Sequence, residues 1–477
     1  MTMKITQFTM TYFNNLIKIK FFLYLIIVLL GYKILFAQDN SEKVQIINAD
    51  LMVGSQTESG LIRSYFGNII LKHNNIEARC DTAYQYFTNN SVKLLGNVFI
   101  KQDRMILKSS IVRYDGNSGI SYADKMIEIT DGDTYLAASQ GRYNTKSLIA
   151  NFYQNVNIKD NEISIIADSA RYNRKNQNSE AKGNVLAEND SFMIISDYLF
   201  YHRESRESKS YGNVFFKGKY DNIYLVADTV INIPKIKYTS ASGKPILFKV
   251  DSTIMENVIK YDTLSISSNL MEAIREKKEN EKFIFTDSVE IIRDNVKAKA
   301  DNAIYFAYNE LLFLYGNPVL WMDSLQLKAD SIVIYMPDRE LKLIHSFGNA
   351  FIASKDDTND IRRINQLLGE SIKIYISEKK VEKIECIGNA KSLYYLTSEN
   401  TFDGVNINSC DTINIYFEKG KPVEVHWLGK VEGEYYPEKM VWREAERFYL
   451  PKFEWLQNIP TKKYLTVPQN VNKKIHN

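Results

Sequence analysis

The feature that most limits how this chain can fold is an internal repeat of 29 residues. Its first marker is a Gly-Asn pair followed by alternating apolar residues, found at Gly67-Asn68, Gly96-Asn97, Gly183-Asn184 and Gly212-Asn213. Asn97 and Asn184 are 87 residues apart, which is three periods, and the two intervening copies read Lys125-Met126 and Gln154-Asn155. A fixed period of this length is typical of chains built from stacked supersecondary units.

A second marker recurs in phase with the first: a small residue, then Asp or Ser, then an alternating run that ends in Tyr. Its copies are Cys80-Asp81, Ser109-Ser110, Ala138-Ser139, Ala167-Asp168 and Ser196-Asp197. An acidic residue that returns so regularly is more typical of a turn or of a ladder between strands than of catalysis. The tyrosines Tyr114, Tyr143, Tyr172 and Tyr201 could stack on sugars or bases, but their spacing favours an aromatic ladder that stabilises a sheet.

Two columns of the repeat are apolar in every copy. The position after each Asn holds Ile69, Val98, Ile127, Val156, Val185 and Val214, and two further on stand Leu71, Ile100, Ile129, Ile158, Ala187 and Phe216. The position between these columns is mixed. Period-two alternation with one apolar side predicts a half-buried strand, so we expect both columns to face inward.

The remaining positions of each repeat are rich in turn residues. Gly accepts a positive φ at low cost and Asn tolerates the left-handed region, so we expect Gly-Asn at the turn before the strand. Segments such as Asp115–Gly119 and Lys175–Asn178 are typical of further tight turns. Each repeat should therefore hold two or three short strands, and neighbouring repeats must stack because one unit cannot bury its own apolar side.

The repeats form two blocks, which we place at residues 42–233 and 246–433, with a boundary between Pro234 and Pro245. In the second block the markers drift, and Gly348-Asn349, Gly388-Asn389 and Gly429-Lys430 are separated by 40 and 41 residues. The extra length includes Asp356–Gly369, where Ile361, Ile364, Leu367 and Leu368 suggest a short amphipathic helix. Leu270–Lys282 fits either a helix or a degraded strand. Residues 434–477 carry no repeat and are expected to form a cap or strap.

Residues 1–37 are typical of a signal peptide or, if they stay attached, of an N-terminal anchor. Lys18 and Lys20 precede an apolar run from Phe21 to Leu30, and cleavage is expected after Ala37. The chain has a formal net charge of +3, and this segment holds four lysines and no acid, so the remainder carries −1. A chain so close to neutrality offers no basic face for nucleic acid.

Residue types that support catalysis or metal binding are scattered. The five histidines have no ligand spacing, and we find no motif for a nucleophile, a phosphate or a redox dithiol. We therefore predict no catalytic residue, no metal and no cofactor, and no enzyme activity. The three cysteines give no disulfide framework; Cys386 and Cys410 could pair, but buried free thiols are the preferred interpretation.

The repeated motifs resemble those of the OstA-like family, which includes LptA and the N-terminal periplasmic domain of LptD. The resemblance rests on runs such as Ala167–Tyr172 followed by Gly183–Ala187, and it covers roughly residues 42–233 and 283–433. Asn365–Gly369 and Trp427–Tyr436 resemble the long OstA-like proteins of Bacteroidetes-type bacteria.

This resemblance implies an all-β fold, an open antiparallel β-jellyroll shaped like a trough. It implies a periplasmic protein, soluble, tethered to the inner membrane or associated with the outer membrane, which binds the acyl chains of lipopolysaccharide. It also implies partners among other Lpt-type jellyrolls, added edge to edge, or an end-to-end oligomer. The groove would then be lined by Ile69, Leu71, Val98, Ile100, Ile127, Ile129, Val156, Ile158, Val185, Val214 and Phe216.

Two other interpretations fit the same columns. A parallel β-helix, either an adhesin or a polysaccharide-binding or polysaccharide-active protein, also has a repeat of this length. A purely structural scaffold would use the same columns to fill a closed core. The pattern does not distinguish a lipid groove from such a core.

Overall fold

A computed structural model describes residues 45–465, apart from short gaps at 59, 74–75, 131, 133–134, 145, 160–162, 174, 177, 203, 221, 256–257, 356–361 and 399–400. The predicted signal peptide at 1–37 lies outside the described residues, as does the end of the C-terminal segment. The described residues fall into two compact units, 45–236 and 237–465. That the repeat blocks at 42–233 and 246–433 are separate domains stays a prediction. No helix within the described part of the chain is long and apolar enough to cross a membrane.

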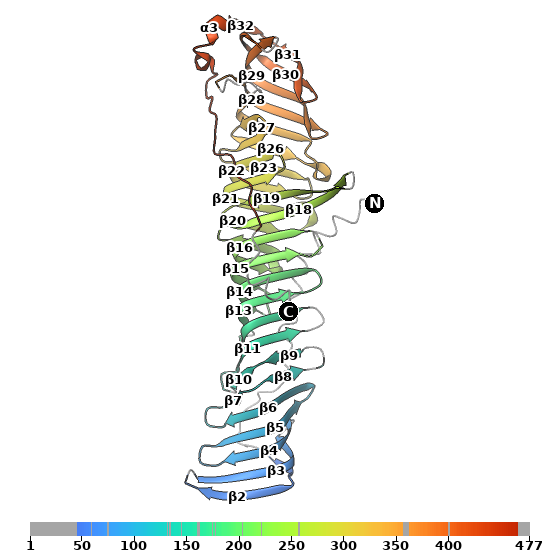
Figure 1. Ribbon diagram of the computed structural model, residues 1–477, viewed down its shortest axis with the longest axis vertical. Coiled ribbons are helices and arrows are strands. Elements are labelled where there is room, and N and C mark those ends of the chain that lie inside the picture. Colours follow the sequence, from blue (N-terminus) through green and yellow to red (C-terminus); the bar gives the residue numbers. More distant parts are fainter. Residues whose placement is uncertain are drawn as a thin grey trace. The chain divides into compact units, whose positions relative to one another are not determined.

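Unit 1 consists of antiparallel strands, which Figure 1 shows stacked as successive rungs from blue to green. The strands are β1 (Gln45–Asn48), β2 (Leu51–Thr57), β3 (Gly60–His73), β4 (Ile76–Tyr86), β5 (Ser91–Gln102), β6 (Met105–Asp115), β7 (Ile120–Ala123), β8 (Ile127–Thr130), β9 (Tyr135–Ala138), β10 (Gln140–Asn144), β11 (Ile149–Lys159), β12 (Ser164–Asn173), β13 (Asn178–Glu188), β14 (Phe192–His202), β15 (Ser208–Gly218) and β16 (Ile223–Ile233). Most pairings join consecutive strands, as in β4–β5 and β12–β13, some skip a strand, as in β1–β3 and β6–β8, and all of these are antiparallel. The all-β antiparallel prediction is confirmed, and the parallel β-helix is wrong.

Unit 2 is built in the same way and ends in an irregular segment. Its elements are β17 (Tyr238–Ser242), β18 (Ile246–Met255), β19 (Val258–Ser267), β20 (Leu270–Ile274), η2 (Lys278–Asn280), β21 (Lys282–Arg293), β22 (Val296–Phe306), β23 (Leu311–Tyr315), β24 (Val319–Met322), β25 (Leu325–Lys328), β26 (Ser331–Tyr335), η3 (Pro337–Arg339), β27 (Leu343–Lys355), β28 (Ile364–Ser377), β29 (Lys380–Ser398), β30 (Thr401–Glu418), β31 (Lys421–Leu428), β32 (Glu432–Pro437), α3 (Glu438–Val441) and η4 (Ala445–Phe448). From Glu438 onward the chain forms what we call the C-terminal strap, residues 438–465.

Both helices considered from the sequence are absent where the structure describes those segments. Ile364, Leu367 and Leu368 belong to β28, which pairs with β27 on one side and β29 on the other. Leu270–Ile274 is β20, and the following residues form only one 3-10 turn. These segments are short, and neighbouring strands on both sides satisfy their backbone groups, so sheet pairing overrides a weak helical pattern.

We had predicted turns between strands at the Gly-Asn pairs. In the structure these pairs form bulges within strands instead. In β5, Gly96 has a φ of 69° and Asn97 a φ of 45°, and the pairing with β6 skips from Leu95 to Val98. Two successive left-handed residues bend the strand while leaving it hydrogen-bonded on both sides of the bend. Each long strand therefore has two halves that meet at a corner.

The acidic residue of the second marker locks this corner. Asp81 of β4 accepts a hydrogen bond from the Asn97 side-chain amide, with 2.8 Å between Nδ2 and Oδ2. A Cβ atom on Gly96 would clash with that carboxylate, so glycine is required there. The same amide–carboxylate pairs are Asn68–Asp50, Asn184–Asp168, Asn213–Asp197, Asn317–Asp301, Asn349–Asp330 and Asn389–Glu370. The predicted structural role of these acids is confirmed.

Candidate functional site

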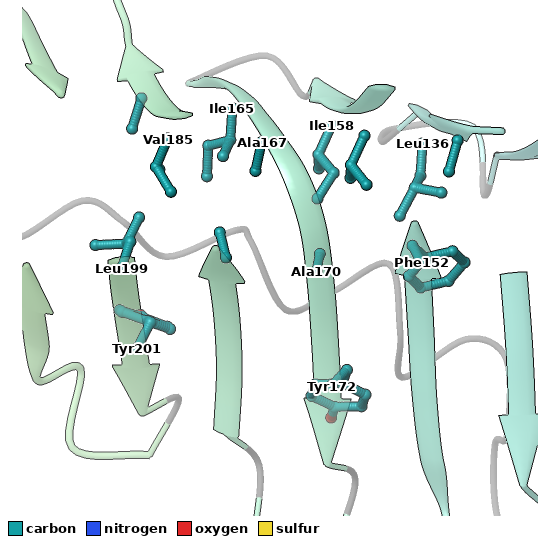
Figure 2. Close-up of a cluster of buried hydrophobic side chains, with 14 of the residues drawn as sticks. Leu136, Phe152, Ile158, Ile165, Ala167, Ala170, Tyr172, Val185, Leu199 and Tyr201 are labelled. Atoms are coloured by element: carbon teal, nitrogen blue, oxygen red, sulfur yellow. The ribbon is translucent and has the colours of Figure 1, made fainter. Parts of the chain in front are cut away.

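The predicted inward columns lie in the interior of unit 1. Ten of the eleven residues are buried, and Ile100 is partly buried. Ile69, Leu71 and Val98 belong to one apolar cluster, with Ile100 packed against it. Ile127, Ile129, Val156, Ile158, Val185, Val214 and Phe216 belong to a second cluster, part of which is shown in Figure 2. Leu107 packs against both clusters, so the columns form one connected apolar surface.

The small residue of the second marker is explained by what it faces. Val98 lies opposite Ser109, Val156 opposite Ala167, and Val185 opposite Ser196. At the corner a β-branched side chain on one strand thus meets a small one on the next. A larger residue would have to displace its partner, because protein interiors are close-packed.

The sequence interpretation missed a second inward surface, on the half-strands before the corners in β11 and β13 and on the paired halves of β12 and β14. Its residues in the larger cluster are Ala150, Phe152, Ala170, Tyr172, Ala181, Leu199 and Tyr201. Figure 2 shows Ala170 and Tyr172 on one strand and Leu199 and Tyr201 on another. The signal was present in the alternation of Ala150 and Phe152, but the Gly-Asn pair had been taken as the start of the strand.

The tyrosines do not form the aromatic ladder that their spacing suggested. Ser179 stands between Tyr172 and Tyr201 in the strand register, so the two rings are not direct cross-strand neighbours. Both are buried in the apolar cluster, whereas Tyr114 is 40% exposed. The column therefore contributes to the interior rather than to a stack on the surface.

The inner and outer faces of these half-strands differ sharply in polarity. The members of both inner clusters are apolar or cysteine and tyrosine, and none carries a charge at neutral pH. On the outer face, Arg142 lies over the rings of Tyr122 and Tyr153, at 5.4 and 5.8 Å from their centroids. The inner face can accommodate apolar groups, and the outer face suits water and polar ligands.

The titration behaviour of the interior fits this picture. Burial raises the pKa of the Cys80 thiol to about 11, so this group is protonated at neutral pH and is a poor nucleophile. The three cysteines are free thiols and buried, as preferred from the sequence. No group of metal-ligating side chains occurs among the residues that the structure describes.

Two corners of unit 1 lack the acid. At one, the Asn155 side-chain amide donates to the Ser139 hydroxyl at 3.3 Å, and at the other the lock is missing altogether. Here Ser110 replaces the acid and Lys125-Met126 replaces Gly-Asn, and the strand is interrupted between β7 and β8. An open hollow of about 480 Å³ lies beside this interruption, with Val98, Phe99 and Met126 among its lining residues. Met126 is 58% exposed. The broken corner thus brings a residue of the inward columns to the wall of a hollow.

In unit 2 the C-terminal strap covers an apolar outer face. Val441, Ala445 and Leu450 of the strap share a buried cluster with Phe351, Ala353, Leu393 and Tyr395. The buried side-chain amide of Gln326 donates to the Glu454 carbonyl at 2.7 Å and accepts from the Leu456 amide at 2.8 Å. Arg363, itself buried, makes two hydrogen bonds to Glu438, at 2.8 and 2.5 Å. The predicted strap is thus held by both apolar and polar contacts.

These features define a class: antiparallel β-repeat proteins with an apolar interior and a polar outer face. Residues 41–152 match the model of a family described as OstA-like protein. The resemblance inferred from the repeats is confirmed for this stretch, which is OstA-like. No curated protein matches the sequence.

Among solved structures, the chain is similar to LptH of Pseudomonas aeruginosa, described as the LptA homologous periplasmic component of the conserved lipopolysaccharide transport device. The identity is 14%, the alignment covers 29% of this chain and 93% of LptH, and the TM-score is 0.23.

Proposed function

We propose that this chain is a non-enzymatic periplasmic protein that carries lipopolysaccharide by sheltering its acyl chains among the inward columns. The observation that carries the proposal is the connected apolar surface of unit 1, on which no charged side chain interrupts the rows from Ile69 to Phe216. The OstA-like match of residues 41–152 supports a role in outer-membrane lipid transport.

The energetics of such a carrier follow from the repeat. Each buried CH₂ group of an acyl chain contributes about 0.8 kcal/mol, so a few methylenes give appreciable affinity. In the lipid-free chain the columns contact each other; an acyl chain between them exchanges these contacts for similar ones. Because every repeat presents the same residue types, the affinity stays nearly constant from rung to rung, which favours movement over trapping.

The proposed partners are other jellyroll proteins of the transport system, which would add strands at an exposed edge. At the N-terminal end of unit 1, all seven residues of β2 are exposed, and Leu51, Met52 and Val53 are apolar. An exposed strand of this kind invites addition of another strand. Export by residues 1–37 would deliver the chain to the periplasm, where it would be free or tethered to a membrane.

The second candidate is a structural scaffold. It is favoured by the low exposure of the inward columns, because side chains such as Val156, which is 1% exposed, also suit a closed core. The two functions make opposite predictions about contact with lipid in the cell.

A site-specific photo-crosslinker distinguishes them. We would introduce it at Val98 and Val156, which face inward, and at Lys101 and Asn157, which are exposed on the same strands. The carrier predicts lipopolysaccharide adducts at the two inward positions, at least about tenfold above those at the exposed positions. A probe at Met52 should capture a second protein rather than lipid.

The remaining outcomes decide against the carrier. If none of the inward positions captures lipid while the protein is folded, the columns fill a closed core and the scaffold holds. If the purified protein binds saccharides and no lipid, the polysaccharide-binding alternative is favoured in an antiparallel form. Equal capture at inward and exposed positions would also contradict a groove.

A further inference from the structure

The inward face of unit 1 changes character toward β13–β15. Ser179, Ser196, Ser208 and Ser210 are all buried there. Tyr172, Ser179, Tyr201 and Ser208 form one row, each facing the next across neighbouring strands. A line of hydroxyl groups therefore runs through the interior next to the apolar residues.

Two of these hydroxyls have no partner within the described part of the chain. Ser179 is 1% exposed and Ser196 is 2% exposed, and neither Oγ atom makes a hydrogen bond. A buried hydroxyl without a partner loses its bonds to water and gains nothing in exchange. Folded proteins hold few such groups, and each one calls for an explanation.

Packing alone does not require serine at these two positions, as a comparison with the preceding repeat shows. One period earlier, the position of Ser179 is occupied by Ala150 and that of Ser196 by Ala167, both of them buried. Ala150 lies between Tyr143 and Tyr172 in the register, just as Ser179 lies between Tyr172 and Tyr201. Alanine thus fits the same setting, and the serine adds only an oxygen.

The inward side chains next to Ser179 are aliphatic. Its inward neighbour along β13 is Ala181, which faces Ala170 on one side and Leu199 on the other. Figure 2 shows Ala170 and Leu199 beside the two tyrosines on the strands that flank β13. An acyl chain that exchanges contacts with these aliphatic side chains would bring an oxygen on the chain close to Ser179.

We infer that the β13–β14 part of the interior is selective for acyl chains that carry an oxygen, with Ser179 and Ser196 as the hydrogen-bonding groups. The inference rests on the proposed carrier function and names its cargo more closely. The oxygen is either a hydroxyl on the chain or the carbonyl of an ester, since a serine hydroxyl can donate to both and can accept from the first. A plain hydrocarbon chain would leave both serines unpartnered.

The test compares hydroxypalmitic acids, with the hydroxyl near the carboxyl end or near the middle of the chain, with palmitic acid, and it compares methyl palmitate with hexadecane. Each oxygen-bearing probe then has a matching chain that lacks the group under test. The full-length protein should bind at least one oxygen-bearing probe about fivefold more tightly than the matching plain chain, as expected for one added hydrogen bond. A preference confined to the hydroxy acids identifies the chain hydroxyl, and one confined to the ester identifies the carbonyl.

The variants Ser179→Ala and Ser196→Ala supply the second readout. Each should reduce the preference toward unity and leave hexadecane binding unchanged, while the lipid-free protein melts about 2 °C higher because an unpartnered hydroxyl has been removed. Ser169→Ala, in the row of β12 that faces away from the interior, is the matched control and should change neither quantity.

The outcomes separate this inference from the carrier itself. If palmitic acid binds but no probe is preferred, or the preference survives in both variants, the inference is wrong and the carrier stands. If no acyl probe binds and crosslinking also fails, the proposed function is wrong. A lower melting temperature of the Ser179→Ala and Ser196→Ala variants would contradict the claim that these hydroxyls are unpartnered.

Discussion

The two units follow the same repeat but differ in one outward column. Four residues after each corner Asn, unit 1 carries Lys72, Lys101, Lys159, Glu188 and Lys217. The corresponding positions of unit 2 hold Ile292, Trp321, Ala353 and Leu393, all of them buried. The inward position three residues after Asn is apolar in both units at Ile100 and Ile352. The backbone plan is thus kept while the outer surface changes from charged to apolar.

This difference explains why a strap exists where it does. An apolar outward column needs a cover, and in unit 2 the cover is residues 438–465, which pack Leu450 against Phe351 and Ala353. The buried amides of Gln326 and Gln366 bond to the backbone of the strap and would lose these partners without it. In unit 1 the charged column interacts with water directly. One column of a repeat therefore determines whether a sheet face stays open.

The largest expected effect comes from weakening the strap. Leu450→Ala removes a buried side chain from the cluster and should lower the stability of unit 2 by about 3 kcal/mol. Hydrogen exchange of the β27–β30 amides measures this separately from unit 1, which should be unchanged. Ile459→Ala, at a strap position that is 37% exposed, is the control and should cost less than about 1 kcal/mol. Equal effects at both positions would mean that the strap is not anchored at Leu450.

A smaller effect is expected at the corners of unit 1. Gly183 has a φ of 74°, and a Cβ atom would clash with the Asp168 carboxylate. Gly183→Ala should therefore cost about 2–3 kcal/mol, from left-handed backbone strain and from the disturbed Asn184–Asp168 bond. Denaturant-induced unfolding, together with hydrogen exchange of the β12–β14 amides, provides the measurement. Gly54→Ala, where a Cβ atom meets nothing, should be nearly neutral; a similar loss there would contradict the corner lock.

The repeat period and the inward columns were predictable because both depend on residue type at a fixed spacing. Burial of Val98 or Val156 follows from alternation alone, whatever the strands pair with. The Gly-Asn corner was mistaken for a turn because the same left-handed pair serves both purposes. Only the partner strand decides whether the chain reverses or continues, and that information is not local.

Other features were beyond sequence reasoning for similar reasons. The strap was predicted as a segment without repeats. Its contacts could not be predicted, because Gln326 and Leu450 bond to residues more than 80 positions away in the sequence. Ile364–Gly369 is too short for its period to separate helix from strand. Whether Ser179 has a hydrogen-bond partner depends on side chains from two neighbouring strands, so no pattern within β13 could reveal it.

The smallest expected effect tests the last corner of unit 2, where Lys430 replaces the usual Asn. Lys430 keeps the left-handed conformation, with a φ of 47°, and Asp411 is placed against Gly429 as at the other corners. Lysine is less suited than Asn to this conformation, and its amine is at the end of a long flexible chain. Lys430→Asn should therefore stabilise unit 2 by about 1 kcal/mol through both the backbone and a new bond to Asp411.

Lys419→Asn separates the two contributions. Lys419 is also left-handed, with a φ of 50°, but it lies in the hairpin turn between β30 and β31 instead of at a Gly-Asn corner. Its replacement should show the backbone benefit without an amide–carboxylate bond, so the difference in denaturation midpoint between the two variants isolates the corner lock. If Lys430→Asn is no more stabilising than Lys419→Asn, the Asp411 carboxylate does not contribute at this corner, and the lock does not extend to the last corner of unit 2.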